Sequence, residues 1–216
     1  MAKYISNPNP YSKTLDRKFL HIFLILSSIL GGFGLAYWYS QTKNFYHAIF
    51  GYILLFAYVF VTYKLLKQIG KNDRGELAEL NVKKVLFELS DSYTVFQNVQ
   101  IKKDFDIDFV VVGPSGIFTV EVKSHFKAGF FARKRFINQA FAEAMLLKEY
   151  LKAAGIKMYI SPVLVLTRAQ TSYSAPQNGV CVTSPDFLLT FIAQARKFTF
   201  DKEKVETLIK NLYKAH

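Results

Sequence analysis

Hydrophobic residues are concentrated in two uncharged runs near the N-terminus of the chain. Residues 19–40 and 45–63 contain no Lys, Arg, Asp or Glu. Each run is close to the ~20 residues that a helix needs to cross ~30 Å of membrane hydrocarbon. Only residues 41–44 separate them, which is enough for a tight turn. The pattern predicts that residues 1–72 form a transmembrane helical hairpin and its linker.

The positions of basic residues predict how this hairpin is oriented. Lys43 is the only basic residue in the turn, whereas several basic residues lie on each outer flank: Lys3, Lys13, Arg17 and Lys18 before the first run, and Lys64, Lys67, Lys71 and Arg74 after the second. Cytoplasmic segments next to membrane helices are enriched in Lys and Arg. We therefore expect both termini, and the domain that follows, to be cytoplasmic.

Residues 73–216 have the mixed pattern of a soluble domain. Apolar residues recur with helical period in residues 74–90, 137–154, 185–197 and 202–215. Short apolar or alternating runs, typical of strands, occupy residues 93–99, 105–112, 117–124, 158–167 and 179–183. Strands preceded, interrupted and followed by helices predict an α/β fold with a mixed sheet flanked by helices.

Composition narrows the classes of protein and partner. The hydrophobic fraction of 51% excludes a disordered chain, and the single Cys excludes a disulfide framework or a multi-cysteine metal site. The chain has 28 basic and 16 acidic residues, a net charge of +12. Part of this surplus flanks the hairpin. The rest indicates a polyanionic partner, either nucleic acid or anionic lipid.

The two central strands bring charged residues together. If residues 113–116 form the turn, Val112 faces Ile117, Asp108 lies opposite Glu121, and Asp106 opposite Lys123. Side chains alternate between the faces of a strand, so these four charged residues share one face, which we expect to pack against nothing. The other face is then wholly apolar and consists of Ile107, Phe109, Val111, Phe118, Val120 and Val122.

Two carboxylates facing each other across a strand pair need compensation. Like charges at opposed positions destabilise a sheet, so Asp108 and Glu121 require a cation, a shared proton or open water. Carboxylate oxygens are ligands for Mg²⁺, with Lys123 two residues beyond Glu121. The alternative is a solvated polar face with an ordinary ion pair.

Four segments resemble a known family. They read GELAELNVKKVLFEL, FQNVQI, DIDFVVVGPSGIFTVEVKS and INQA, within residues 74–150. Together they are similar to the nuclease-related domain (NERD), a branch of the PD-(D/E)xK nuclease superfamily. The resemblance implies a restriction-endonuclease-like sheet and a divalent cation, Mg²⁺ or Mn²⁺.

The resemblance also implies roles for individual residues. Asp108 and Glu121 would be metal ligands, and Lys123 would orient the attacking water or stabilise charge on the phosphate. Glu79, or Glu76, would complete the metal site from the preceding helix, although an acidic first turn of a helix needs no such role. Gln139 would be the polar residue contributed by the following helix, or a plain helix residue.

A segment rich in aromatic and basic residues follows the central strands. Residues 126–136 read FKAGFFARKRF and include Lys127, Arg133, Lys134 and Arg135. Such a loop suits nucleic-acid phosphates and stacked bases, and suits anionic headgroups equally well. Both partners, DNA (with RNA as an alternative) and the lipid bilayer, stay open at this point.

The function that we expect is a membrane-anchored, Mg²⁺-dependent nuclease that hydrolyses DNA phosphodiester bonds. The alternatives are a membrane-tethered nucleic-acid-binding module without catalytic turnover and a membrane assembly protein whose basic surface contacts lipid.

Overall fold

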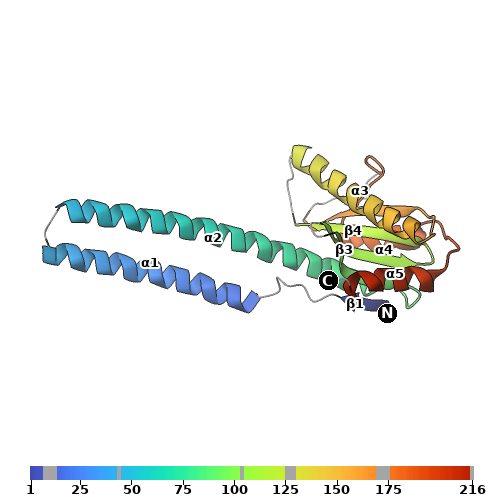
Figure 1. Ribbon diagram of the computed structural model, residues 1–216, viewed down its shortest axis with the longest axis horizontal. Coiled ribbons are helices and arrows are strands. Elements are labelled where there is room, and N and C mark those ends of the chain that lie inside the picture. The colour runs from blue at the N-terminus through green and yellow to red at the C-terminus, as the bar shows by residue number, and fades with distance from the viewer. Residues whose placement is uncertain (7–13, 43–44, 103–104, 125–129, 169–175, 215–216) are drawn as a thin grey trace. The chain divides into compact units, whose positions relative to one another are not determined.

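The computed structural model describes the chain apart from residues 7–13, 43–44, 103–104, 125–129, 169–175 and 215–216 (Figure 1). The chain divides into two compact units. One consists of Met1–Asn9 together with Gly75–His216, and the other of Pro10–Arg74.

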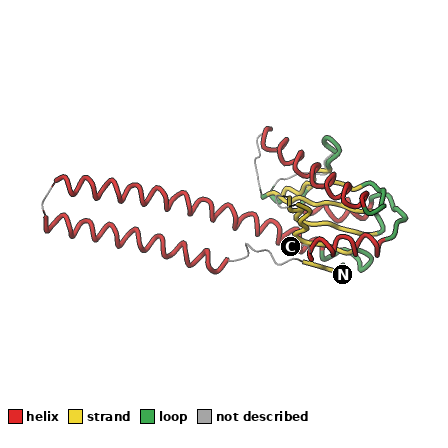
Figure 2. Tube along the Cα trace, viewed as in Figure 1, coloured by secondary structure: helices red, strands yellow, loops and turns green. Residues whose placement is uncertain are grey.

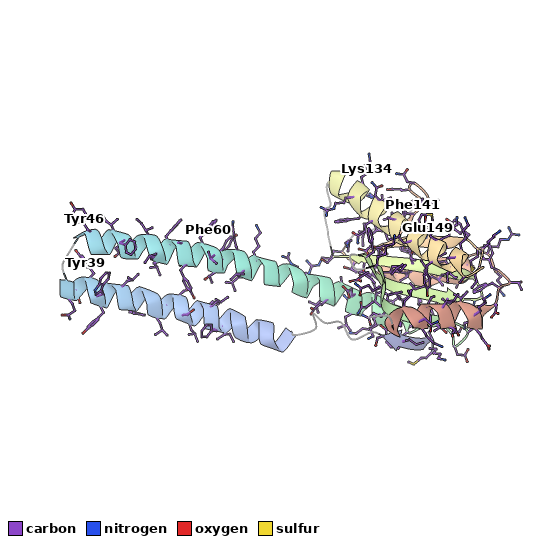
Figure 3. The ribbon with its side chains drawn as sticks, in the orientation of Figure 1. Tyr39, Tyr46, Phe60, Lys134, Phe141 and Glu149 are labelled. Carbon is purple, nitrogen blue, oxygen red and sulfur yellow. The ribbon has the colours of Figure 1, made fainter. Side chains whose placement is uncertain are left out.

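The unit Pro10–Arg74 is helical. It contains α1 (Thr14–Thr42) and the first part of α2 (Phe45–Leu86). The segments Ile22–Gln41 and Ile49–Lys67 are long and apolar enough to cross a membrane, by length and composition. Most of their large apolar side chains are exposed, as Phe60 illustrates in Figure 3. The two apolar helices are thus as predicted.

The other unit is a mixed α/β domain built on one six-stranded sheet (Figure 2). The strands lie side by side in sequence order: β1 (Lys3–Ser6), β2 (Thr94–Lys102), β3 (Phe105–Gly113), β4 (Gly116–Lys123), β5 (Ile160–Leu166) and β6 (Cys181–Thr183). The pairs β2–β3 and β3–β4 are antiparallel, and the other three pairs are parallel. This confirms the predicted fold class of a mixed sheet flanked by helices.

The strand β1 was not predicted. Lys3–Ser6 pairs in parallel with residues 94–97 of β2, and the Tyr4 ring stacks on Phe87 with 4.7 Å between centroids. Ala2 is buried beside these contacts. Four residues carry too little periodicity to indicate a strand, so the pairing became visible only in the folded domain. Residues 3–6 therefore belong with the sheet rather than with the helical hairpin.

Helices cover both faces of the sheet. On one face, the end of α2 (through Ala78, Val82 and Leu86) and α4 (Pro185–Gln194) enclose a core cluster. On the other face, α3 (Phe130–Ala153) and α5 (Lys202–Lys214) enclose a second cluster that includes Leu147 and Ile209.

Two helices differ in extent from the prediction. The helix predicted over residues 74–90 is the end of α2, which is continuous from Phe45 to Leu86. The helix predicted to begin at residue 137 begins at Phe130. Arg133, Lys134 and Arg135 are therefore on the first turns of α3 and not in a loop, which corrects our expectation for these residues.

Candidate functional site

The central hairpin has the predicted register where the ladder is formed. Val112 pairs with Ile117 and Phe109 with Val120, so the turn is at Pro114–Ser115 as expected. The ladder ends at the Phe109–Val120 pair. Immediately beyond it, the backbone N–H of Val122 donates to Asp108 Oδ2 at 2.7 Å. Asp108 is thus tied to the neighbouring strand at the level of Glu121.

The side chain of Ile107 lies on the opposite face of the sheet from the one predicted. Ile107 packs with Phe96 and Val99, while Phe109 packs in the cluster on the opposite face of the sheet. The alternation of side chains therefore breaks at Asp108. The alternation of side chains along β2 is interrupted at the same level. There Asn98 has a φ of 56°, a left-handed conformation that Asn tolerates better than most residues.

The polar face of the hairpin is buried at Glu121, whereas Asp106 on the same predicted face is exposed. Glu121 is only 1% exposed, and nearer the turn the same face continues as the buried residues Thr119 and Ile117. We expected this face to pack against nothing, and for Glu121 that was wrong. The reason is tertiary: α3 lies over this face and brings polar side chains of its own to Glu121.

Glu121 is held by two donors. The Lys123 ammonium forms an ion pair with Glu121 Oε1, and Gln139 Nε2 donates to the same oxygen at 2.8 Å. The Lys123 ammonium also lies 5.6 Å from the centre of the Phe136 ring, within cation–π range. The structure therefore brings together Asp108, Glu121, Lys123 and Gln139, all of which the sequence singled out.

Glu143 belongs to the same cluster and was missed. It is 2% exposed, and its Oε1 accepts a hydrogen bond from Gln139 Nε2 at 2.9 Å. Residues four apart share a face of a helix, so the inward position of Gln139 is the signal that could have identified Glu143.

Burial and repulsion between carboxylates raise the pKa values of Glu79, on α2, and of Asp108. Burial, followed by the charge of Asp108, raises the pKa of Glu79 to about 7. Burial and the charge of Glu121 raise the pKa of Asp108 well above its ordinary range, against the hydrogen bond from Val122, which lowers it. Glu79 is therefore close enough to Asp108 for the charge of one carboxylate to raise the pKa of the other.

The pKa values of the two carboxylates next to α3, Glu121 and Glu143, are also raised. Burial and the charge of Glu143 raise the pKa of Glu121 to about 7, although Lys123 lowers it. Burial also raises the pKa of Glu143 to about 7. Burial alone would lower the pKa of Lys123, but the charge of Glu121 and the ion pair with it outweigh burial and raise the pKa.

The carboxylate oxygens of this cluster are of the chemical type that a hard divalent cation binds. Glu121 Oε2 and Glu143 Oε2 are buried and have no hydrogen-bond partner within the described part of the chain. Carboxylate oxygens of this kind are ligands that Mg²⁺ accepts. In the geometry of the described residues, however, no three His, Cys, Asp or Glu side chains are arranged to hold a metal ion. The Lys123 ammonium is the positive charge that neutralises Glu121 here.

Two of the predicted nucleic-acid contacts, Arg133 and Lys134, line a hollow at the start of α3. The hollow has a volume of about 600 Å³ and is lined by Arg133, Lys134, Ile137, Pro176, Gln177 and Asn178. Arg133 Nε is buried and has no hydrogen-bond partner among the described residues. Figure 3 shows Lys134 at this end of α3. Lys127 lies outside the described residues.

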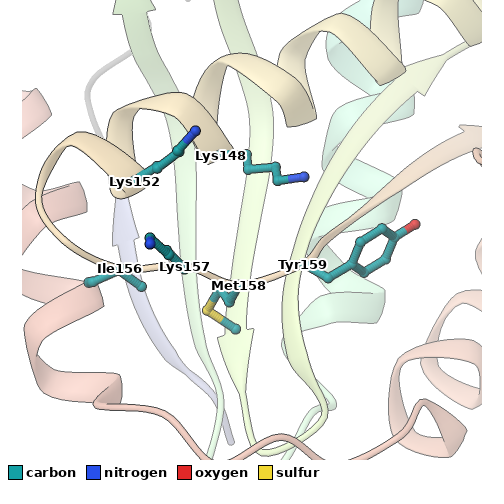
Figure 4. Close-up of a pocket in the computed structure, with 6 residues that line it drawn as sticks. All are labelled: Lys148, Lys152, Ile156, Lys157, Met158 and Tyr159. Atoms are coloured by element: carbon teal, nitrogen blue, oxygen red, sulfur yellow. The ribbon is translucent and has the colours of Figure 1, made fainter.

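A second basic hollow lies at the other end of α3 (Figure 4). It has a volume of about 370 Å³ and is lined by Lys148, Lys152, Ile156, Lys157, Met158 and Tyr159. From Gln139 to Lys152 the helix rises about 20 Å at ~1.5 Å per residue. This hollow is therefore separate from the carboxylate cluster, and its lysines provide a comparison for the basic residues near the site.

Comparison with known protein families finds a match to part of the α/β domain. Residues 74–167 match the family model described as the nuclease-related domain. No curated protein matches the chain. No solved structure matches it either. The matched segment contains Glu79, Asp108, Glu121, Lys123, Gln139 and Glu143. This match confirms, for residues 74–167, the resemblance to the nuclease-related domain that the sequence segments indicated.

Proposed function

We propose that the protein is a metal-dependent nuclease that hydrolyses phosphodiester bonds in DNA. The observation that carries the proposal is the convergence of Asp108, Glu121 and Lys123 at one end of the β3–β4 hairpin, within a nuclease-related domain. Glu121 Oε2, which is buried and has no hydrogen-bond partner among the described residues, supports a cation at this point.

Each residue has a role that follows from its position. Asp108 and Glu121 would hold Mg²⁺ or Mn²⁺, with Glu79 contributing from α2. When bound, such a cation lowers the pKa of a coordinated water and neutralises charge on the phosphate. Lys123 keeps its proton, because its pKa is raised. Its ammonium can therefore donate to a phosphate oxygen as negative charge develops there. Gln139 holds the Glu121 carboxylate in place.

The start of α3 supports a nucleic-acid partner. Arg133 and Lys134 line a hollow that also contains the polar side chains of Gln177 and Asn178. Lys and Arg contacts to phosphates provide most of the sequence-independent affinity of proteins for DNA. In this proposal Arg133, Lys134 and Arg135 contact the phosphates next to the scissile bond. Anionic lipid headgroups are the competing partner for the same cations.

A membrane anchor with both ends on one side is also part of the proposal. The two apolar segments have the length to cross a bilayer. Residues that precede both segments, Lys3–Ser6, pair with β2, which follows both. The chain must therefore cross the membrane an even number of times between β1 and β2 if the segments span it. Together with the basic flanks, this supports two spans with a cytoplasmic domain.

A binding module without turnover is the second candidate. The ion pair between Lys123 and Glu121 favours it, because that pair compensates Glu121 without a metal ion. Such a module would retain DNA affinity and show no metal-dependent cleavage.

The deciding experiment is a cleavage assay with the full-length protein in detergent, since β1 belongs to the domain. Labelled DNA is incubated with Mg²⁺, with Mn²⁺ or with a chelator. Cleavage should require the metal and should be lost in Asp108→Asn and in Glu121→Gln. Glu149→Gln, an exposed position on α3, is the matched control and should cleave normally. Equal cleavage by Asp108→Asn and the wild type would contradict the proposal.

A further inference from the structure

One amide group connects two buried glutamates across the interface between α3 and β4. Gln139 Nε2 lies 2.8 Å from Glu121 Oε1 and 2.9 Å from Glu143 Oε1. A Gln amide has two N–H donors. Both are used here, one for each glutamate, so the position of Glu143 determines how the amide is turned toward Glu121.

The Gln139 amide in turn determines which oxygen of Glu121 has no hydrogen-bond donor. Glu121 Oε1 receives the Lys123 ammonium and the Gln139 N–H, whereas Glu121 Oε2 is buried without a partner among the described residues. A carboxylate held at one oxygen by two donors cannot rotate without breaking both contacts. Its free oxygen is therefore fixed in direction.

Fold stability does not explain an acid at position 143. Glu143 is 2% exposed and lies close enough to Glu121 to affect its charge. Burying a second carboxylate beside the first opposes folding, and an apolar residue of similar volume would avoid that cost. Glu143 Oε2 also lacks a hydrogen-bond partner within the described residues. Such costs are retained mainly where a functional site needs them.

We propose that Glu143 is a positioning residue of the metal site, which turns the Gln139 amide so that Glu121 Oε2 stays directed at the cation. The inference rests on the proposed metal-dependent function of Asp108 and Glu121. It goes further because it assigns a role to an acid on α3 that neither contacts the substrate nor needs to bind the metal.

The test is a double-mutant cycle read out by Mn²⁺ affinity. Mn²⁺ is titrated calorimetrically into the full-length protein in detergent, as wild type, Gln139→Leu, Glu143→Met and the double variant. Substitution of residues that orient metal ligands typically weakens metal binding ~10–100-fold. We expect a loss of this size in each single variant. The double variant should lose little more, because both substitutions break one connection.

Two further variants separate positioning from packing. Glu143→Gln keeps an oxygen that can accept from Gln139, and should restore Mn²⁺ affinity close to that of the wild type. Glu149→Gln changes the charge on the same helix at an exposed position and should have no effect. If Glu143→Met does not fold, Glu143→Asp, whose carboxylate is one methylene short of Gln139, should show the same loss.

The outcomes distinguish this inference from the proposed function. Unchanged Mn²⁺ affinity in folded Glu143→Met, or losses that add in the double variant, would overturn the role of Glu143 even if the wild type cleaves DNA. The expected coupling in a wild type that never cleaves DNA would overturn the nuclease activity and leave the positioning role in place.

Discussion

Asp108 accepts a hydrogen bond from the backbone N–H of Val122, at 2.7 Å from its Oδ2, at the point where the β3–β4 ladder has ended. The carboxylate takes the place that a carbonyl oxygen of β3 would occupy in a continued ladder. Its direction is therefore set by the backbone of the neighbouring strand. It is held beside Glu121, whose charge raises the pKa of Asp108.

Asp108→Asn should separate function from stability. An Asn keeps a carbonyl oxygen for the Val122 N–H and removes a negative charge that burial and Glu121 disfavour. We expect metal-dependent cleavage to be lost while the melting temperature in chelator stays the same or rises. Asp108→Ala also loses cleavage, but it removes the hydrogen-bond acceptor and should cost about 1–3 kcal/mol of unfolding free energy. Melts of the two variants in chelator test this, and a destabilised Asp108→Asn would contradict it.

The metal-free protein should lose stability as pH rises through about 7. The pKa values of Glu121 and Glu143 are raised to about 7 from the ordinary 4.5, so the folded state holds protons that the unfolded state has already released. This stabilising contribution is fully present below pH ~4.5 and is lost as pH rises past the raised pKa. Denaturation with urea in chelator at pH 5.5, 6.5 and 8 measures it. Relative to wild type, Glu121→Gln should gain stability as pH rises, and the opposite trend would refute the explanation.

Lys123→Met should impair both catalysis and stability above neutral pH. The ammonium is the ion-pair partner of Glu121, and without it the buried carboxylate loses its compensating charge once ionised. Removing one donor that stabilises transition-state charge typically lowers kcat by about 10²–10³-fold. We expect a loss of that size with DNA affinity nearly unchanged. Lys148→Met, at the far end of α3, is the control. A change in KM alone would indicate that Lys123 only binds substrate.

The basic residues at the start of α3 should contact nucleic-acid phosphates. For duplex DNA, each phosphate contact contributes about 0.9 to the slope of log affinity against log salt concentration. Lys134→Ala and Arg135→Ala together should therefore lower the slope by nearly two. Lys148→Ala with Lys152→Ala removes the same charge from the other hollow on α3 and should change the slope less. Equal slopes for the two pairs would contradict the assignment, as would loss of binding to anionic vesicles with no effect on DNA.

Both ends of the chain should lie on the same side of the membrane. The strand pairing of Lys3–Ser6 with β2 requires residues on either side of the helical hairpin to share one compartment. Topology reporters fused before residue 1 and after residue 216 should give matching cytoplasmic signals, and a reporter inserted in residues 41–44 should give the opposite one. Different signals from the two termini would rule out two spans.

The sequence alone determined the features that depend on neighbours along the chain. The two apolar segments are visible because every residue in them is uncharged. The register of β3 and β4 follows from a two-residue turn, Pro114–Ser115, so Asp108, Glu121 and Lys123 could be assigned to one end of one hairpin. Short-range geometry of this kind is a direct consequence of strand alternation.

Tertiary packing decided the rest. The burial of Glu121 depends on α3, whose Gln139 donates to it from 18 residues away along the chain and also holds Glu143. The break in alternation that moves Ile107 to the other face coincides with the left-handed Asn98 on the neighbouring strand. The pairing of Lys3–Ser6 with β2 joins residues separated by the whole helical hairpin. The pattern of apolar residues in a segment indicates whether that segment is a helix or a strand. It does not indicate which other element will pack against it. For that reason the sequence could name Asp108, Glu121, Lys123 and Gln139 as candidates, and only the fold showed that Gln139 contacts Glu121 and that a second glutamate, Glu143, joins them.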